Sequence, residues 1–285
     1  MSSKITTFTC PGKCGDALHQ WPIAYWWHRE QGETFDLWLD QKTCAPLLPL
    51  FSVQPGVRSV ELVPGIESWP MGGQPWHFNL EPEQHQDRLF VHLGMRSFPN
   101  RQITLHAREQ AAVQIAVSQN DLAETPNIEL GEVAKARRVV IHGTAICTHN
   151  KQTPDLWRFI ASIRGWLEQR FPEGIVFVGS ESDRATGLRT YPGWSEFDDQ
   201  GDFLTLARCL AGSELVIGCG SVVAALAGQI KVPCVRVHDD IGGAPKVIWS
   251  NLGNNQLNAT ELELRTEWPA YRDRFLGEDH VPAAR

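Results

Sequence analysis

A glycine and a carboxylate come directly after the first apolar run of the chain. Residues 15–22 read Gly-Asp-Ala-Leu-His-Gln-Trp-Pro and follow the β-rich run Ile5 to Cys10. A glycine there lets the backbone turn tightly and approach a ligand. Asp16 could take a proton from an acceptor hydroxyl as a general base, or it could cap the following helix. The spacing alone favours the cap.

A second segment carries residue types suited to an anion. Residues 139–144 read Val-Val-Ile-His-Gly-Thr, and residues 150–154 read Asn-Lys-Gln-Thr-Pro. A loop that leaves a strand and enters a helix presents backbone N–H groups to an anion, and Lys151 adds a point charge. An ordinary strand–loop–helix connection with an exposed lysine fits the pattern equally well.

Two later strand ends are also rich in small and polar residues. Residues 178–183 read Val-Gly-Ser-Glu-Ser-Asp, and residues 216–221 read Val-Ile-Gly-Cys-Gly-Ser. Small residues allow the backbone to approach phosphates closely. The first segment is equally compatible with a polar surface turn, and the second with tight packing of a helix on a sheet.

The elements that must position these residues alternate between strand and helix. A loop over 11–16 is predicted to lead into a helix with Leu18, Trp21, Pro22 and Tyr25 on one face, in which Pro22 marks a kink or the first turn. Strands are predicted at 5–10, 35–39, 57–63, 88–94, 138–142, 175–178, 215–218 and 233–237, and helices at 44–51, 104–117, 153–167, 203–210 and 221–230.

This alternation predicts an α/β fold in which parallel sheets are covered by helices on both faces. Residues 119–136 are polar, contain Pro126 and lack periodicity, so we place a domain boundary there. The prediction is two Rossmann-like domains, 1–125 and 126–285, that face each other across a cleft. The second ends in a tail helix after Thr260.

With this order of elements, residues 15–22 resemble the N-terminal motif of the lipopolysaccharide heptosyltransferases, glycosyltransferase family 9, which have the GT-B fold. The match covers Gly15, Asp16, Leu18, His19 and Pro22. The resemblance implies that Asp16 is the catalytic base. It also places Lys13, Gly15 and His19 on the acceptor side, where His19 packs or forms a hydrogen bond within the helix.

The same resemblance assigns the donor side to the second half. It implies that Thr144 and Lys151 contact the donor diphosphate and that an acidic residue binds the ribose, for which we choose Glu181 over Asp183. Gly179 belongs to that nucleoside loop, and Gly220 and Ser221 belong to the phosphate site.

The chain departs from the family pattern at one segment. Heptosyltransferases carry an Asp, a small residue, a Gly and then a His there, whereas this chain has Cys219 or Gly220 near the first position and Ala225 near the last. Because the missing groups contact donor phosphate and sugar, this departure bears on which sugar the donor carries.

The implied activity is transfer of a sugar from a nucleotide sugar to a carbohydrate or other hydroxyl-bearing acceptor, with inversion. Two alternatives remain open: a nucleotide-sugar binding protein without turnover, and a transferase that acts on a modified DNA base. The resemblance implies no metal and no cofactor besides the donor, although His238-Asp239-Asp240 is a group that could bind a metal.

Charge and composition narrow the class of protein. The formal net charge of −7 disfavours sequence-independent binding to nucleic acid, which depends on Lys and Arg. No apolar stretch approaches the ~20 residues of a membrane span, and the start lacks the apolar core of a secretory signal. The seven cysteines contain no C-x-x-C pair. A reducing, cytoplasmic location is therefore predicted.

Overall fold

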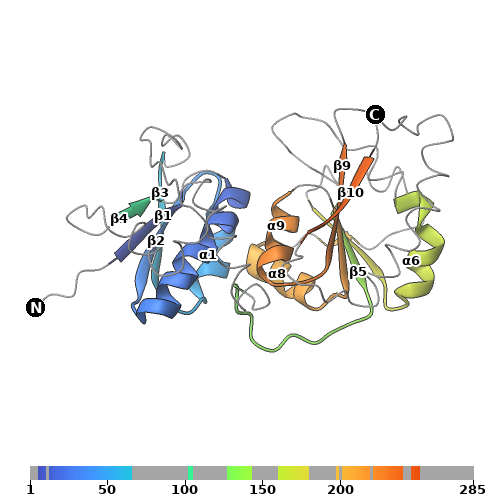
Figure 1. Ribbon diagram of the computed structural model, residues 1–285, viewed down its shortest axis with the longest axis horizontal. Helices are drawn as coiled ribbons and strands as arrows, with labels where there is room; N and C mark the ends of the chain where they lie inside the picture. Colours follow the sequence, from blue (N-terminus) through green and yellow to red (C-terminus); the bar gives the residue numbers. More distant parts are fainter. Residues whose placement is uncertain are drawn as a thin grey trace, which may run out of the picture. The chain divides into compact units, whose positions relative to one another are not determined.

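The computed structural model describes residues 6–10, 13–65, 102–104, 127–142, 160–179, 197–198, 201–218, 221–239 and 245–250. They divide into two compact units, one of residues 1–130 with 201–205 and one of residues 131–200 with 206–285. Each unit has a sheet of its own (Figure 1).

The sheet of the first unit is parallel throughout. Its order is β3-β2-β1-β4, and β1 pairs in parallel with both β2 and β4. Helix α1 follows β1, and η1 and α2 connect β2 to β3. The bounds are β1 Thr6–Cys10, α1 Cys14–Gln31, β2 Phe35–Asp40, η1 Ala45–Leu47, α2 Leu48–Ser52, β3 Val57–Val63 and β4 Gln102–Thr104.

Trp21 anchors helix α1 to this sheet. Its ring stacks on Phe51 with centroids 4.7 Å apart and meets Phe35 at 6.2 Å. Its indole nitrogen donates a hydrogen bond of 2.5 Å to the carbonyl oxygen of Asn127. Leu18, Trp21 and Tyr25 are all buried, which confirms three of the four residues predicted on the apolar face; the side chain of Pro22 is outside the described part. Pro22 does not mark the first turn, because the helix begins at Cys14 and continues to Gln31.

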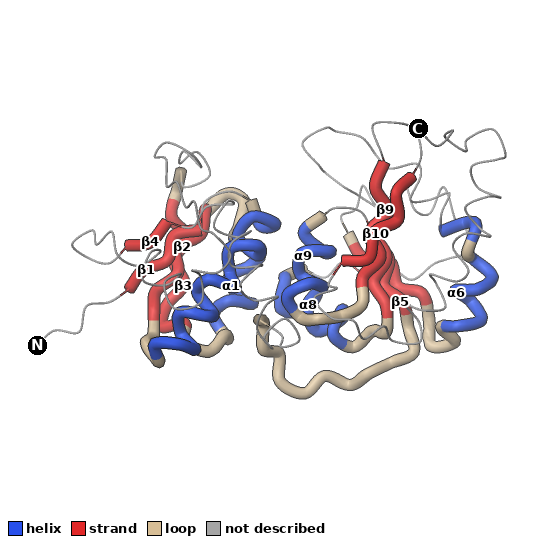
Figure 2. Tube along the Cα trace, viewed as in Figure 1, coloured by secondary structure: helices blue, strands red, loops and turns tan. Residues whose placement is uncertain are grey.

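The second unit has six strands in the order β10-β9-β8-β5-β6-β7. All pairs are parallel except β9 with β10. Figure 2 shows α6 on one face of the sheet and α8 and α9 on the other. The bounds are β5 Val139–His142, α6 Arg164–Arg170, β6 Ile175–Val178, β7 Phe197–Asp198, α8 Phe203–Ala211, β8 Leu215–Gly218, α9 Val222–Gln229, β9 Cys234–Asp239 and β10 Pro245–Ser250.

The central strands of this sheet are buried along their whole length. Every residue of β5 and β8 is buried, as expected for strands with helices on both faces. The predicted α/β fold with parallel sheets is therefore confirmed. The antiparallel edge has a simple cause: only residues 240–244 separate β9 from β10, too few for the helical crossover that a parallel pair needs.

Some predicted elements differ or lie outside the described residues. The predicted helix at 104–117 is wrong at its first residue, because Thr104 pairs with Thr9 in the sheet. Three predicted elements lie wholly or partly outside the described residues: the strand at 88–94, the first part of the helix at 153–167, and the tail helix. Strands β4, β7 and β10 were not predicted. None of the helices in the described ranges has the length and hydropathy to cross a bilayer.

Candidate functional site

The strand order of the second sheet reverses between β5 and β8. From β5 the chain adds β6 and β7 on one side, and then β8 and β9 on the other. In open α/β sheets, ligands bind outside the carboxyl ends of the strands at such a reversal. His142 ends β5 and Gly218 ends β8. The two strand ends are close enough that a Cβ on Gly218 would lie 3.4 Å from the His142 carbonyl oxygen.

Ser221 connects these two strand ends through its side chain. Its hydroxyl lies 3.1 Å from Nδ1 of His142, a hydrogen bond between residues 79 positions apart. His142 is 8% exposed, while Ser221 is half-buried. A buried imidazole therefore holds a partly exposed hydroxyl at the point where the sheet topology favours a ligand.

Ser221 is also the N-cap residue of α9, yet it does not cap the helix. Its backbone is extended (φ −133°, ψ 173°), and its side chain makes no capping hydrogen bond. The first N–H groups of a helix need acceptors, and the helix dipole favours an anion at this end. Since the first turn of α9 has no acidic residue, Ser221 and these amides together form a surface suited to a phosphate.

Gly179 belongs to the same edge of the sheet. It follows β6, the other neighbour of β5, and has φ 146°, which is a conformation that favours glycine. Of the predicted donor residues, the structure thus places Gly179 and Ser221 at the same edge of the sheet, after the two strands that flank β5. Thr144, Lys151, Glu181 and Gly220 lie outside the described residues.

The first sheet reverses at β1, which has β2 on one side and β4 on the other. The chain leaves the carboxyl end of β1 and enters α1 at Cys14, so Gly15 and Asp16 lie in the first helical turn. The predicted loop over 11–16 is wrong from Cys14 onward. Asp16 is the third helical residue rather than the N-cap, and Lys13 before the helix is exposed. The side chains of Asp16 and His19 are outside the described part.

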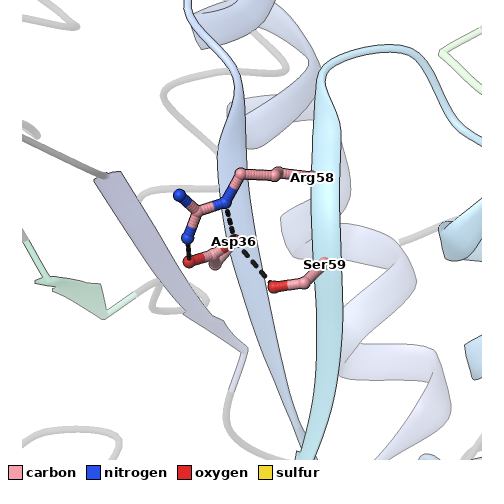
Figure 3. Close-up of polar contacts among 3 residues, drawn as sticks. All are labelled: Asp36, Arg58 and Ser59. Carbon is pink, nitrogen blue, oxygen red and sulfur yellow. Dashed lines mark hydrogen bonds and ion pairs between the residues drawn. The ribbon is translucent and has the colours of Figure 1, made fainter. Parts of the chain in front are cut away.

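An ion pair between the buried Asp36 and the exposed Arg58 occupies the opposite, amino-terminal edge of the first sheet (Figure 3). Arg58 Nε and Ser59 Oγ donate to the same oxygen of Asp36, at 2.8 and 2.7 Å, and Arg58 Nη2 contacts the other oxygen. This carboxylate raises the pKa of Arg58. Because ligands of open α/β sheets bind at the carboxyl edge, we interpret this cluster as structural.

Little in the sequence indicates that His142 belongs to a site. A histidine at the end of a buried strand is more often a satisfied structural residue than a ligand. The one signal was a polar residue closing an otherwise apolar run, Val139 to Ile141. The contact with Ser221 depends on two segments far apart in the chain, so only the structure reveals it.

Comparisons with known proteins agree on the fold. No protein-family model matches the sequence, and no curated protein matches it. Among solved structures, E. coli heptosyltransferase WaaC with ADP matches with a TM-score of 0.54 and 15% identity, covering 92% of this chain and 99% of that one. E. coli ADP-heptose lipopolysaccharide heptosyltransferase II matches with a TM-score of 0.53 and 10% identity, covering 95% and 99%. The resemblance seen in residues 15–22 is therefore confirmed in the architecture: the chain has the fold of the heptosyltransferases, which is the GT-B glycosyltransferase fold.

Proposed function

We propose that the protein is a heptosyltransferase-like glycosyltransferase, which moves a sugar from a nucleotide-sugar donor to an acceptor hydroxyl with inversion. The observation that carries the proposal is the Ser221–His142 pair, at 3.1 Å, beside the N-terminus of α9. The Ser221 hydroxyl and the first amides of α9 lie where the strand order of the second sheet reverses. The second unit is then the donor side and the first unit the acceptor side.

The donor diphosphate would bind along the carboxyl edge of the second sheet. Ser221 and Gly220 with the α9 amides would hold one part of it, and Thr144 and Lys151 after β5 would hold the rest. These groups stabilise the negative charge that develops on the departing diphosphate. Gly179 and Glu181 after β6 would receive the nucleoside, with the Glu181 carboxylate on the ribose hydroxyls.

Asp16 would act as the general base. Its position in the first turn after β1 is at the reversal of the first sheet. As the acceptor hydroxyl attacks the anomeric carbon opposite the diphosphate, Asp16 takes the hydroxyl proton. The transition state is oxocarbenium-like, and the single displacement inverts the anomeric centre.

One observation favours a second candidate function, a nucleotide-sugar binding protein without turnover. Ala225 stands near the position at which heptosyltransferases carry a histidine, and it is buried within α9 at 4% exposure. No polar side chain acts at that position, so this chain lacks one group that the resemblance implies for the reaction.

Donor binding and donor cleavage separate the two functions. We would titrate the protein by calorimetry with a panel of ADP-, UDP- and GDP-sugars, and measure release of nucleoside diphosphate by slow hydrolysis. For a transferase, Asp16→Asn retains the dissociation constant of the donor but lowers turnover by roughly a hundredfold to ten-thousandfold, the usual contribution of a general base.

Glu61→Gln is the matched control, because it removes an exposed carboxylate from β3 in the same unit. It should leave both quantities unchanged. Binding without turnover in the wild type, unaffected by Asp16→Asn, would instead establish the binding protein.

A further inference from the structure

Three cysteines meet at the carboxyl edge of the first sheet, and we call them the thiol cluster: Cys10, Cys14 and Cys44. Cys10 ends β1, Cys14 begins α1, and Cys44 follows β2. All three are reduced in the structure. Within the described ranges, no three His, Cys, Asp or Glu side chains are placed to hold a metal ion.

The turn after β2 places Cys44 next to Thr43, the residue that Cys14 contacts. Asp40, at 1% exposure, accepts hydrogen bonds from the backbone N–H of Lys42 and Thr43 and from the Thr43 hydroxyl. The Cys44 N–H donates to the Asp40 carbonyl oxygen at 2.9 Å. This network fixes the peptide between Thr43 and Cys44.

Cys14 contacts that fixed peptide directly. Its Sγ donates to the Thr43 carbonyl oxygen at 2.9 Å, and the Thr43 hydroxyl lies 3.6 Å from the Cys44 sulfur. Cys14 is half-buried, whereas Cys10 and Cys44 are fully buried. An oxidant from solution therefore reaches the Cys14 thiol before the Cys44 thiol.

The acidities of the buried thiols differ in a way that assigns their roles. The pKa of the Cys44 thiol is lowered, chiefly by its interaction with the Cys14 side chain and against the effect of burial. The pKa of the Cys10 thiol is raised by burial and by the proximity of Cys44. Since the thiolate is the nucleophile in thiol chemistry, Cys44 is the thiol equipped to attack an oxidised Cys14 sulfur, whereas Cys10 stays protonated.

We infer that Cys14 and Cys44 form an oxidation site at which a hydroperoxide drives formation of an intramolecular disulfide. The Cys14 sulfur attacks one oxygen of hydrogen peroxide and the O–O bond breaks. This gives a sulfenic acid, while the thiol proton and the leaving hydroxide form water.

The Cys44 sulfur then attacks the Cys14 sulfur. The S–O bond breaks, and the departing hydroxide takes the proton of Cys44 to form a second water. In sum, two thiols and one hydrogen peroxide give one disulfide and two waters.

This bond would tie the first turn of α1 to the turn after β2. Cys14 lies two residues before Asp16, so oxidation should also slow sugar transfer. That consequence rests on the proposed function, whereas formation of the disulfide does not. Peptide mapping tests the disulfide whether or not the protein is a transferase.

The test treats the full chain with hydrogen peroxide, blocks remaining thiols by alkylation, and maps peptides by mass spectrometry without reduction. The expected result is a dominant cross-linked peptide that joins Cys14 to Cys44, lighter by two hydrogens and absent after treatment with dithiothreitol. Cys44→Ser should instead leave a sulfenic acid on Cys14 that dimedone traps.

Cys209→Ser is the matched control, since it removes a buried thiol of α8, and it should retain the Cys14–Cys44 peptide. The inference is overturned if both thiols remain open to alkylation after peroxide, or if Cys14 pairs with any other cysteine. Should Cys44→Ser fail to fold, the wild-type peptide map decides alone.

Discussion

At the scale of single residues, the proposed donor site depends most on the hydrogen bond between Ser221 and His142. An N-cap serine ordinarily bonds to the amides of its own helix, but this hydroxyl pairs with His142 from another strand. The helix thereby loses a cap that contributes about 1 kcal/mol. A ligand that satisfies the amides would recover this cost, which is why we place the donor phosphate there.

Ser221→Ala should therefore weaken donor binding. A hydrogen bond to a charged group contributes roughly 1.5–3 kcal/mol, so the dissociation constant should rise about tenfold or more. Calorimetry with the best donor of the panel measures it. Ser52→Ala, which changes an exposed serine of α2, is the control, and equal dissociation constants for the two variants would remove Ser221 from the site.

At the scale of elements, two turns contain a glycine with a positive φ. Comparing substitutions at these two glycines distinguishes the cost of backbone strain from the cost of a steric clash. Gly32 and Gly56 have φ of 65° and 79°. A Cβ on Gly32 would meet nothing within 4 Å, whereas a Cβ on Gly56 would lie 2.3 Å from Cγ of His28. The His28 ring is held by its contact with the Glu33 carbonyl oxygen, at 3.0 Å.

Gly32→Ala should lower the free energy of unfolding by only about 1–2 kcal/mol, the cost of the left-handed backbone. Gly56→Ala should lower it by roughly 1–3 kcal/mol more, because the clash with the His28 side chain adds to that cost. Urea unfolding of both variants measures the difference. Equal losses would mean that His28 does not pack against this turn.

The end of α9 offers a stabilising change. Lys231 has φ 59°, and the N–H of Val232 donates to the Ala227 carbonyl oxygen, the bond of a Schellman cap whose left-handed position favours glycine. Burial also lowers the pKa of Lys231 below 10.5. Lys231→Gly should raise the free energy of unfolding by about 1 kcal/mol from the backbone alone.

The gain in the free energy of unfolding from Lys231→Gly should depend on pH. Below the lowered folded-state pKa of Lys231, the folded protein carries the cost of a buried ammonium, and this cost disappears as the pH rises to the ordinary value of 10.5. The advantage of Lys231→Gly should thus be largest near neutral pH and narrow in alkali. Thermal melts across this range measure it, and an advantage that grows in alkali would contradict the assignment.

The elements could largely be predicted where burial leaves a clear pattern. Strands β6 and β8 begin and end at the predicted residues because apolar runs stand between turn residues. The start of α1 was placed too late because Cys14 and Gly15 are not typical first residues of a helix. Strand β7 has two residues, which is too short to show the alternation of apolar and polar residues from which a strand is predicted.

At the scale of the whole molecule, the chain consists of two units, and each sheet reverses its strand order at its first strand. The sequence could predict this α/β repetition and, through the motif at 15–22, the GT-B fold. It could not predict which strand ends meet, because β5 and β8 become neighbours only through the crossovers between them. The pairing of His142 with Ser221 depends on that neighbourhood.

The most direct test of the account is a crystal structure of the protein with the nucleoside diphosphate that binds it best in the calorimetric panel. We predict phosphate oxygens within hydrogen-bond distance, about 3 Å, of the Ser221 hydroxyl and the first amides of α9. A nucleotide bound elsewhere, with the end of β8 and the start of α9 untouched, would contradict the proposed donor site.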